Sequence, residues 1–169
     1  MSRKKISAGF TLIETLVYLA LFAIVIGGGI VAVYNIIEGT NANRNQAILQ
    51  EEANFLLRKV DWALTGATSI TTPAAAASGG NLVINKSIGG VSTTLTFSTC
   101  VANYVCLQRA AAPAQSLNSG SIKVTNLKFQ RSTSVPGKPD AITTTFTLTT
   151  AQNGRTATQN FSTTKYLRK

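Results

Sequence analysis

GFTLIETLVYLALFAIVIGGGIVAVYNII, residues 9–37, joins a short basic leader to a long apolar segment. None of the 23 positions from 15 to 37 carries a charged residue. As a helix this run would extend roughly 34 Å at about 1.5 Å per residue, enough for a bilayer core of about 30 Å. Arg3, Lys4 and Lys5 precede it and favour an amino terminus inside the cell, with the rest of the chain outside.

Glu14 is an acidic residue at the amino-terminal end of this apolar segment. An unpaired carboxylate in lipid is costly, so Glu14 requires a partner. A plain signal anchor accounts for the leader and the span but leaves Glu14 unexplained. A cleaved secretory signal fits less well, because its apolar stretch is about 7–15 residues long and its small residues follow that stretch. Here the small residues Ser7, Ala8 and Gly9 come first.

The order of basic leader, Gly9-Phe10, Glu14 and apolar run resembles the amino-terminal motif of type IV pilins and of the pseudopilins of type II secretion and DNA uptake. The resemblance implies that a prepilin peptidase cuts after Gly9 and that Phe10 becomes the N-methylated first residue. It also implies that Glu14 directs filament assembly by pairing with the amine of a neighbouring subunit. Such head-to-tail contacts do not close, so they build fibres.

Gly27, Gly28 and Gly29 interrupt the apolar helix, at a cost of about 1 kcal/mol each relative to Ala. One interpretation is close packing between helices, since small residues let backbones approach in a membrane. The other is a flexible point that bends or unwinds when the subunit leaves the bilayer for a filament, as related filaments are thought to do. The sequence leaves both open.

The helix is expected to continue beyond the membrane as an amphipathic half. Its apolar face follows the helical repeat in Leu49, Ala53, Leu56, Leu57, Val60 and Leu64. We expect this half to cover residues 38–70, with a weaker junction at residues 40–46 and Pro73 as the terminator. Trp62, near its end, is expected to pack at the edge between helix and sheet; a docking role for its side chain is the alternative.

The remaining residues, 71–169, predict an antiparallel β domain that begins with a loop over 71–80. Residues 82–97 read as a hairpin around Gly89-Gly90, residues 104–109 as a short strand, and residues 143–166 as Thr-rich strands flanking Asn153-Gly154. A change of alternation near Asn126 predicts a bulge. The fold class is therefore α+β: a long amino-terminal helix packed on a small antiparallel sheet. SIKVTNLKFQR and the closing FSTTKYLRK resemble the carboxy-terminal sheet of minor pseudopilins.

The chain is basic, with 16 Lys and Arg against 6 Asp and Glu. Loss of the leader, residues 1–9, would remove three basic residues and leave 13 against 6, a net charge of +7. Such a surface attracts DNA, anionic surfaces or acidic neighbours in a filament. The basic residues are scattered rather than clustered, which favours a solvated surface over a dedicated nucleic-acid site.

The sequence contains little that could perform catalysis. Without His, the commonest general base and metal ligand is missing. Asp140 is the one acid beyond the helix and is interpreted as a turn residue, so we expect no metal site, no cofactor and no enzyme activity. Cys100 and Cys106 would face an oxidising compartment and are expected to form a disulfide, with free thiols as the alternative.

These observations predict a structural subunit of a type IV pilus-like filament or pseudopilus, of the minor pilin or minor pseudopilin kind. The resemblance implies partners: other subunits through the amino-terminal helix, a prepilin peptidase and an inner-membrane assembly platform. The protein would lie in the cytoplasmic (inner) membrane as a single pass and then enter a cell-surface or periplasmic filament. Two alternatives remain. One is a DNA-uptake (competence) subunit with a basic DNA-contacting surface, and the other is a membrane-anchored binding module that never polymerises.

Overall fold

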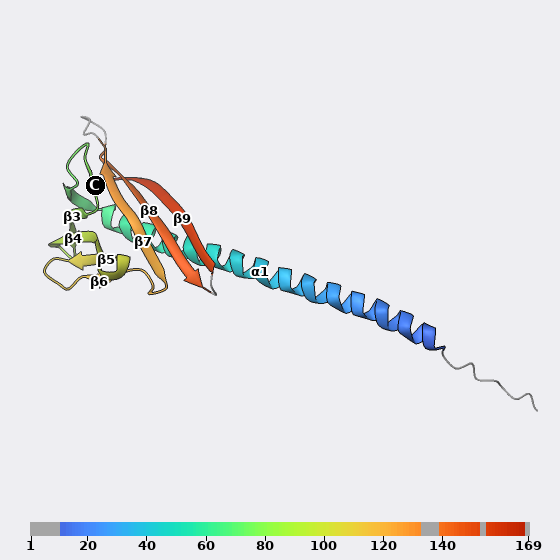
Figure 1. Cartoon of the computed structure of the whole chain (residues 1–169). Helices are drawn as coiled ribbons and strands as arrows, with labels where there is room; N and C mark the ends of the chain where they lie inside the picture. The colour runs from blue at the N-terminus through green and yellow to red at the C-terminus, as the bar shows by residue number, and fades with distance from the viewer. Residues whose placement is uncertain (1–10, 133–138, 153–154, 168–169) are drawn as a thin grey trace, which may run out of the picture. The chain divides into compact units, whose positions relative to one another are not determined.

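The computed structural model describes residues 11–132, 139–152 and 155–167. The chain divides into two compact units, with the boundary between residues 43 and 44. Helix α1 (Leu12–Leu64) extends through both units (Figure 1). The helix is uninterrupted at residues 27–29 and at the predicted weak junction over 40–46, where the Thr40 hydroxyl donates to the Ile36 carbonyl at 2.8 Å.

The first unit presents apolar side chains on all sides of the helix. Ile13, Ile24 and Val25 are each 70% exposed or more, and the other large apolar side chains up to Ile37 are exposed as well. Large apolar side chains are normally buried, and burial would stabilise the protein by about 1.5–3 kcal/mol for each of them. This part of α1 therefore needs lipid or other chains around it.

The second unit packs residues 44–64 of α1 against two antiparallel sheets, which replace the single predicted sheet. The five-stranded sheet has the order β1-β3-β4-β5-β6 and the four-stranded sheet the order β2-β7-β8-β9. The strands are β1 (Ala67–Thr72), β2 (Ser78–Gly79), β3 (Leu82–Ile88), β4 (Val91–Cys100), β5 (Tyr104–Arg109), β6 (Gln115–Ser116), β7 (Ile122–Arg131), β8 (Ala141–Gln152) and β9 (Arg155–Tyr166). A short 3-10 turn, η1 (Val101–Asn103), joins β4 to β5.

The core of this unit contains the predicted apolar face of α1. Leu49, Ala53, Leu56, Val60 and Leu64 are buried, and Leu57 packs against them while partly exposed. They meet large side chains from both sheets, among them Phe97, Phe129, Ile142, Phe146 and Leu148. The helix face thus holds the two sheets together, which explains why its amphipathic pattern is so regular.

The predicted helix end was wrong. Residues 67–70 are not helical: α1 ends at Leu64, Gly66 takes a φ of +73°, and β1 follows at once. Gly adopts this left-handed conformation readily and so terminates helices. The Thr-rich segment then pairs with β3 through Ile70 and Ile84, because its branched side chains suit a sheet. Pro73 therefore follows a strand and not a helix.

The predicted turns and the predicted bulge agree with the pairing register of the strands. β3 and β4 pair up to Ile88 and Val91, with Gly89 and Gly90 between them at φ values of +60° and +82°. The register of β7 with β8 shifts between Thr125 and Lys128, where the bulge at Asn126 was expected. β8 and β9 pair up to Gln152 and Arg155, so the strands flanking Asn153-Gly154 are confirmed, whereas these two turn residues lie outside the described part.

Candidate assembly site

The amino-terminal end of α1 is organised around Thr11. The backbone N–H of Glu14 lies 3.3 Å from the Thr11 hydroxyl and 3.1 Å from the Thr11 carbonyl oxygen. A Thr three residues before a Glu is the sequence pattern of a capping box, in which the Thr side chain satisfies a helix N–H that has no partner within the helix. The spacing of Thr11 and Glu14 is the sequence signal that could have predicted this cap.

Glu14 is partly buried and lies one turn before Tyr18 on the same side of the helix. The Tyr18 hydroxyl donates to Oε1 of Glu14 at 3.3 Å. Within the described residues, this long hydrogen bond leaves most of the acceptor capacity of the carboxylate unused, since its two oxygens can accept about four hydrogen bonds. Glu14 is thus oriented by its own helix and retains positions at which a cationic donor can bind. The i, i+4 spacing of Glu14 and Tyr18 is a further sequence signal that our interpretation missed.

The surroundings of Glu14 are apolar. Leu12, Ile13, Leu16 and Val17 are exposed around it, and α1 is long and apolar enough to cross a membrane by length and composition. In such surroundings a charge pair is stronger than in water, because the dielectric constant is low. Gly9 and Phe10, the predicted cleavage and methylation residues, lie outside the described residues.

Gly27, Gly28 and Gly29 lie in regular helix and have open space around them. A Cβ atom built at any of the three would meet no atom within 4 Å, apart from the neighbouring helix backbone. No close approach within the described part of the chain therefore requires glycine here. The two interpretations, packing against another chain and a flexible point in the helix, therefore both stay predictions.

The predicted cysteine pair lies far along the sequence, with Cys100 at the end of β4 and Cys106 in β5. Cys100 and Cys106 form a disulfide in the structure, with their Cα atoms 5.9 Å apart. This separation is within the usual range for bridged cysteines. The bridge ties β4 to β5 at the end of their pairing, where Cys100 faces Tyr104.

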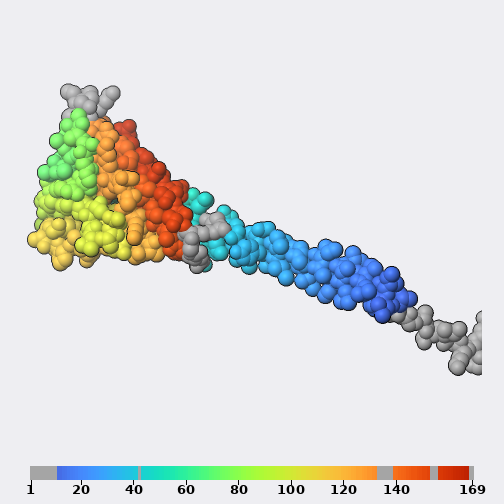
Figure 2. All heavy atoms as spheres, in the orientation of Figure 1, coloured from blue at the N-terminus to red at the C-terminus, as the bar shows by residue number. Residues whose placement is uncertain are grey.

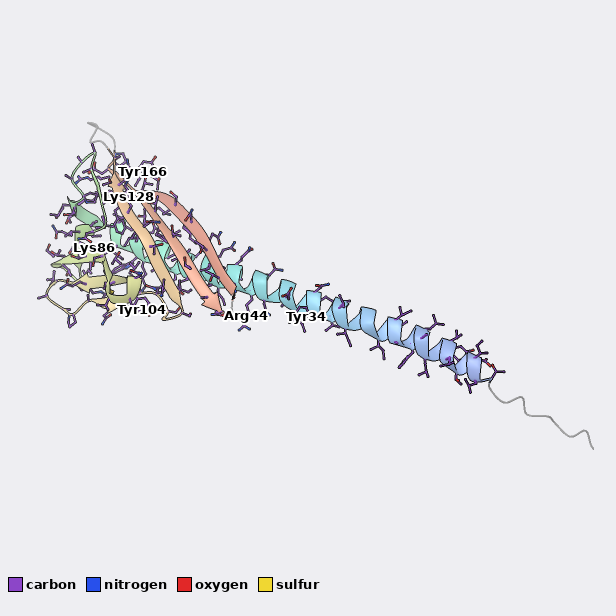
Figure 3. The ribbon with its side chains drawn as sticks, in the orientation of Figure 1. Tyr34, Arg44, Lys86, Tyr104, Lys128 and Tyr166 are labelled. Carbon is purple, nitrogen blue, oxygen red and sulfur yellow. A yellow bond between two sulfur atoms is a disulfide. The ribbon has the colours of Figure 1, made fainter. Side chains whose placement is uncertain are left out.

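Trp62 lies at the end of α1 and is 39% exposed. Nζ of Lys86 lies 4.4 Å from the centre of its ring, and the guanidinium carbon of Arg109 lies 5.4 Å from it (Lys86 is labelled in Figure 3). Lys86 also donates to the Trp62 carbonyl, which is one of the carbonyls left unpaired at a helix end. These contacts agree with the predicted packing at the edge between helix and sheet, and they place two cations beside one aromatic ring.

Asp140 is not an isolated turn residue. Its Oδ2 lies 2.7 Å from Nη2 of Arg131, and Nη1 of Arg131 donates to the Ile70 carbonyl at 2.9 Å. Arg131, at the end of β7, thus connects the two sheets through its hydrogen bond to β1, while Asp140, just before β8, binds its other guanidinium nitrogen. Among the described residues, no group of three or more His, Cys, Asp or Glu side chains could hold a metal ion.

Residues 4–30 match the family model described as the prokaryotic N-terminal methylation motif. No curated protein and no solved structure shows significant similarity to the chain. The match covers the second part of the leader, Gly9-Phe10, Glu14 and the start of the apolar helix, so the sequence and the geometry identify the same end of the molecule. The chain carries a prepilin-type methylation motif at the start of an exposed apolar helix.

Proposed function

We propose that this chain, whose methylation motif supports the type IV pilin and pseudopilin family, is a minor pilin or minor pseudopilin that is processed and then polymerises. A prepilin peptidase would cut between Gly9 and Phe10, and Phe10 would be N-methylated. The mature protein would then span the cytoplasmic membrane, with its amino terminus on the inner side of the membrane. An inner-membrane assembly platform would then insert it into a cell-surface or periplasmic filament beside other subunits.

The observation that carries the proposal is Glu14 on an exposed apolar helix next to the methylation motif. After cleavage, the amine of Phe10 would lie one helical turn before Glu14, on the same helix face. A neighbouring subunit offers the same amine, and pairing with it would remove the cost of a carboxylate in apolar surroundings. Because each subunit would donate its amine to one neighbour and accept, through Glu14, the amine of another, the contact repeats without closing.

The experiment separates processing from assembly. In Glu14→Ala the protein should be cut and membrane-bound as in the wild type, while its share in the sheared filament fraction falls at least about tenfold, the effect of losing about 1.4 kcal/mol per contact. Glu38→Gln removes an acid from the other end of the apolar run and serves as the matched control, expected to assemble normally. Normal incorporation of Glu14→Ala would refute the proposal.

A position along the filament fits this chain better than a position at the filament tip. In the family, some tip subunits lack the acid that Glu14 matches, so its presence favours a position along the filament. Type II secretion, a pilus and DNA uptake all use subunits of this design. A membrane-anchored binding module that never polymerises is distinguished by its amino terminus, because such a module keeps Met1.

A DNA-uptake subunit is the second candidate, and the contacts of Trp62 favour it. Lys86 and Arg109 beside an exposed aromatic ring combine cations with a stacking group, as single-strand binding sites do. The full chain in neutral detergent should then bind single-stranded DNA with an affinity that falls steeply with salt. Changing both cations to Gln should reduce the slope of log K against log salt by about 1.4, at about 0.7 per phosphate contact. Negligible binding at low salt would exclude this candidate.

A further inference from the structure

The outer face of strands β7, β8 and β9 is built almost entirely from polar side chains. Alternate residues of these strands point inward and form the core, among them Val124, Phe146 and Leu148. The other residues face away from the core; they are Lys123, Thr125, Lys128 and Gln130 on β7, Thr143, Thr145, Thr147 and Thr149 on β8, and Thr156, Thr158, Asn160, Ser162, Thr164 and Tyr166 on β9. We call this surface the threonine face. Figure 2 shows its three strands side by side.

The hydroxyl groups of the threonine face are held in place by one another. Thr143 and Thr164 lie 2.8 Å apart, Thr149 and Thr158 lie 3.2 Å apart, and each pair shares a hydrogen bond between its hydroxyl oxygens. Thr147 donates to the side-chain oxygen of Asn160 at 2.7 Å. The branched Cβ of Thr also restricts its rotamers. A ligand that binds here therefore loses little side-chain entropy, because the face is already ordered.

The face has positive charge along one side and an aromatic ring at one end. Lys123 is paired in register with Thr149, and Lys128 with Thr145, and both lysines are exposed. Tyr166 ends the row on β9 and is 62% exposed; Figure 3 labels it together with Lys128. Within the described residues, the threonine face carries no carboxylate. It thus offers hydroxyls, cations and one flat apolar ring, without a group that repels anions.

We propose that the threonine face binds an anionic polysaccharide. A sugar chain presents hydroxyl groups at short, regular intervals, and the face presents side chains about 4.8 Å apart across strands and about 6.8 Å apart along them. The lysines would pair with the carboxylates of the polymer, and the Tyr166 ring would pack against the apolar face of a terminal sugar ring. Hydroxyls already paired with one another still have lone pairs with which to accept from the sugar.

The same observations argue against two other occupants. Two lysines neutralise at most about two phosphates, whereas affinity for DNA depends mainly on the number of phosphates contacted. A protein partner would favour aromatic and apolar side chains at the centre of its interface, and the centre of the threonine face is Thr145, Thr147 and Asn160. The inference does not depend on polymerisation, because a single chain carries the whole face.

The test uses the full chain in neutral detergent and three probes: polygalacturonate, the same polymer methyl-esterified to remove its charge, and duplex DNA. Binding should be strongest to polygalacturonate. Two variants at the centre should act in opposite directions: Thr147→Glu should raise the Kd about tenfold and Thr147→Lys should lower it by a similar factor, as expected for hydrogen bonds to charged groups. A gain of affinity cannot result from misfolding. Tyr166→Ala should weaken binding to the charged and the esterified polymer alike.

Two double variants test whether the polysaccharide binds on the threonine face or elsewhere. Lys123→Gln with Lys128→Gln removes two charges from the threonine face, and Arg58→Gln with Lys59→Gln removes two charges from α1. The first double variant should raise the Kd about tenfold. The second should change it less than about twofold, as expected for charges on another part of the molecule, outside the contact. No polysaccharide binding, binding of duplex DNA that the first double variant weakens more than it weakens binding of polygalacturonate, or equal effects of both double variants would each overturn the inference.

Discussion

Replacing Asn118 with Ala should destabilise the second unit strongly, because this side chain satisfies two buried backbone groups. Asn118 lies between β6 and β7 and is 7% exposed. Its Oδ1 accepts from the N–H of Val105 at 2.7 Å, and its Nδ2 donates to the carbonyl of Ile122 at 2.6 Å. It thus joins a strand of the five-stranded sheet to a strand of the four-stranded sheet. Alanine would leave both backbone groups without these partners.

The magnitude follows from the number of groups lost. A buried donor or acceptor left unsatisfied costs about 1–3 kcal/mol, so the two together should lower the free energy of unfolding by about 2–6 kcal/mol. For a unit of this size each kcal/mol corresponds to about 4 °C in Tm, so Tm should fall by roughly 8 °C or more. This is a large effect for a side chain of modest size that lies outside any strand.

The assay can be restricted to the second unit. The chain has a single tryptophan, Trp62, at the end of α1 in that unit, so its fluorescence in a urea titration reports on the folding of that unit. Asn81→Ala, at an exposed Asn in a loop, is the matched control and should change stability by less than about 0.5 kcal/mol. If Asn118→Ala unfolded at the same urea concentration as Asn81→Ala, the reasoning from buried backbone groups would be refuted.

Three further predictions concern the disulfide, the ion pair between Arg131 and Asp140, and the glycines. Changing Cys100 and Cys106 to Ser should lower the free energy of unfolding by about 2–2.5 kcal/mol in urea, and a reductant should then have no further effect; an additional loss would contradict this. Asp140→Asn should cost about 1–3 kcal/mol by removing the charged partner of Arg131, measured in the same titration, whereas an unchanged midpoint would show that the pair contributes nothing. Gly28→Ala should raise helix stability by about 1 kcal/mol yet reduce the filament fraction, and undiminished assembly would argue against a role for this glycine.

The sequence predicted local structure well wherever a short-range rule decided it. The apolar face of α1 from Leu49 to Leu64, the turn at Gly89-Gly90 and the bulge at Asn126 each depend on spacing or on backbone conformation that neighbouring residues determine. The helix end was mispredicted because β1 is stabilised by pairing with β3, a contact between residues far apart in the sequence. Propensity alone cannot anticipate such pairing.

The candidate site was predicted in its residues but not in its contacts. Glu14 stood out because it precedes a long uncharged run, and the prepilin-type motif is confirmed. The helix-capping contact from Thr11 and the hydrogen bond from Tyr18 were readable from spacing but had not been used. The threonine face, in contrast, depends partly on contacts that spacing along the sequence does not determine. Alternation along β8 is visible in the sequence, whereas the alignment of Thr147 with Asn160 depends on the register of two strands.

The most direct test is the mass of the amino-terminal peptide from protein recovered in the filament fraction, with and without a prepilin peptidase. With the peptidase, we expect the peptide to begin at Phe10 and to carry one N-methyl group. Without it, the protein should keep its leader and be missing from the filament fraction. A chain that remains intact from Met1 in the presence of an active peptidase, or that enters filaments uncut, would contradict the proposed processing and assembly.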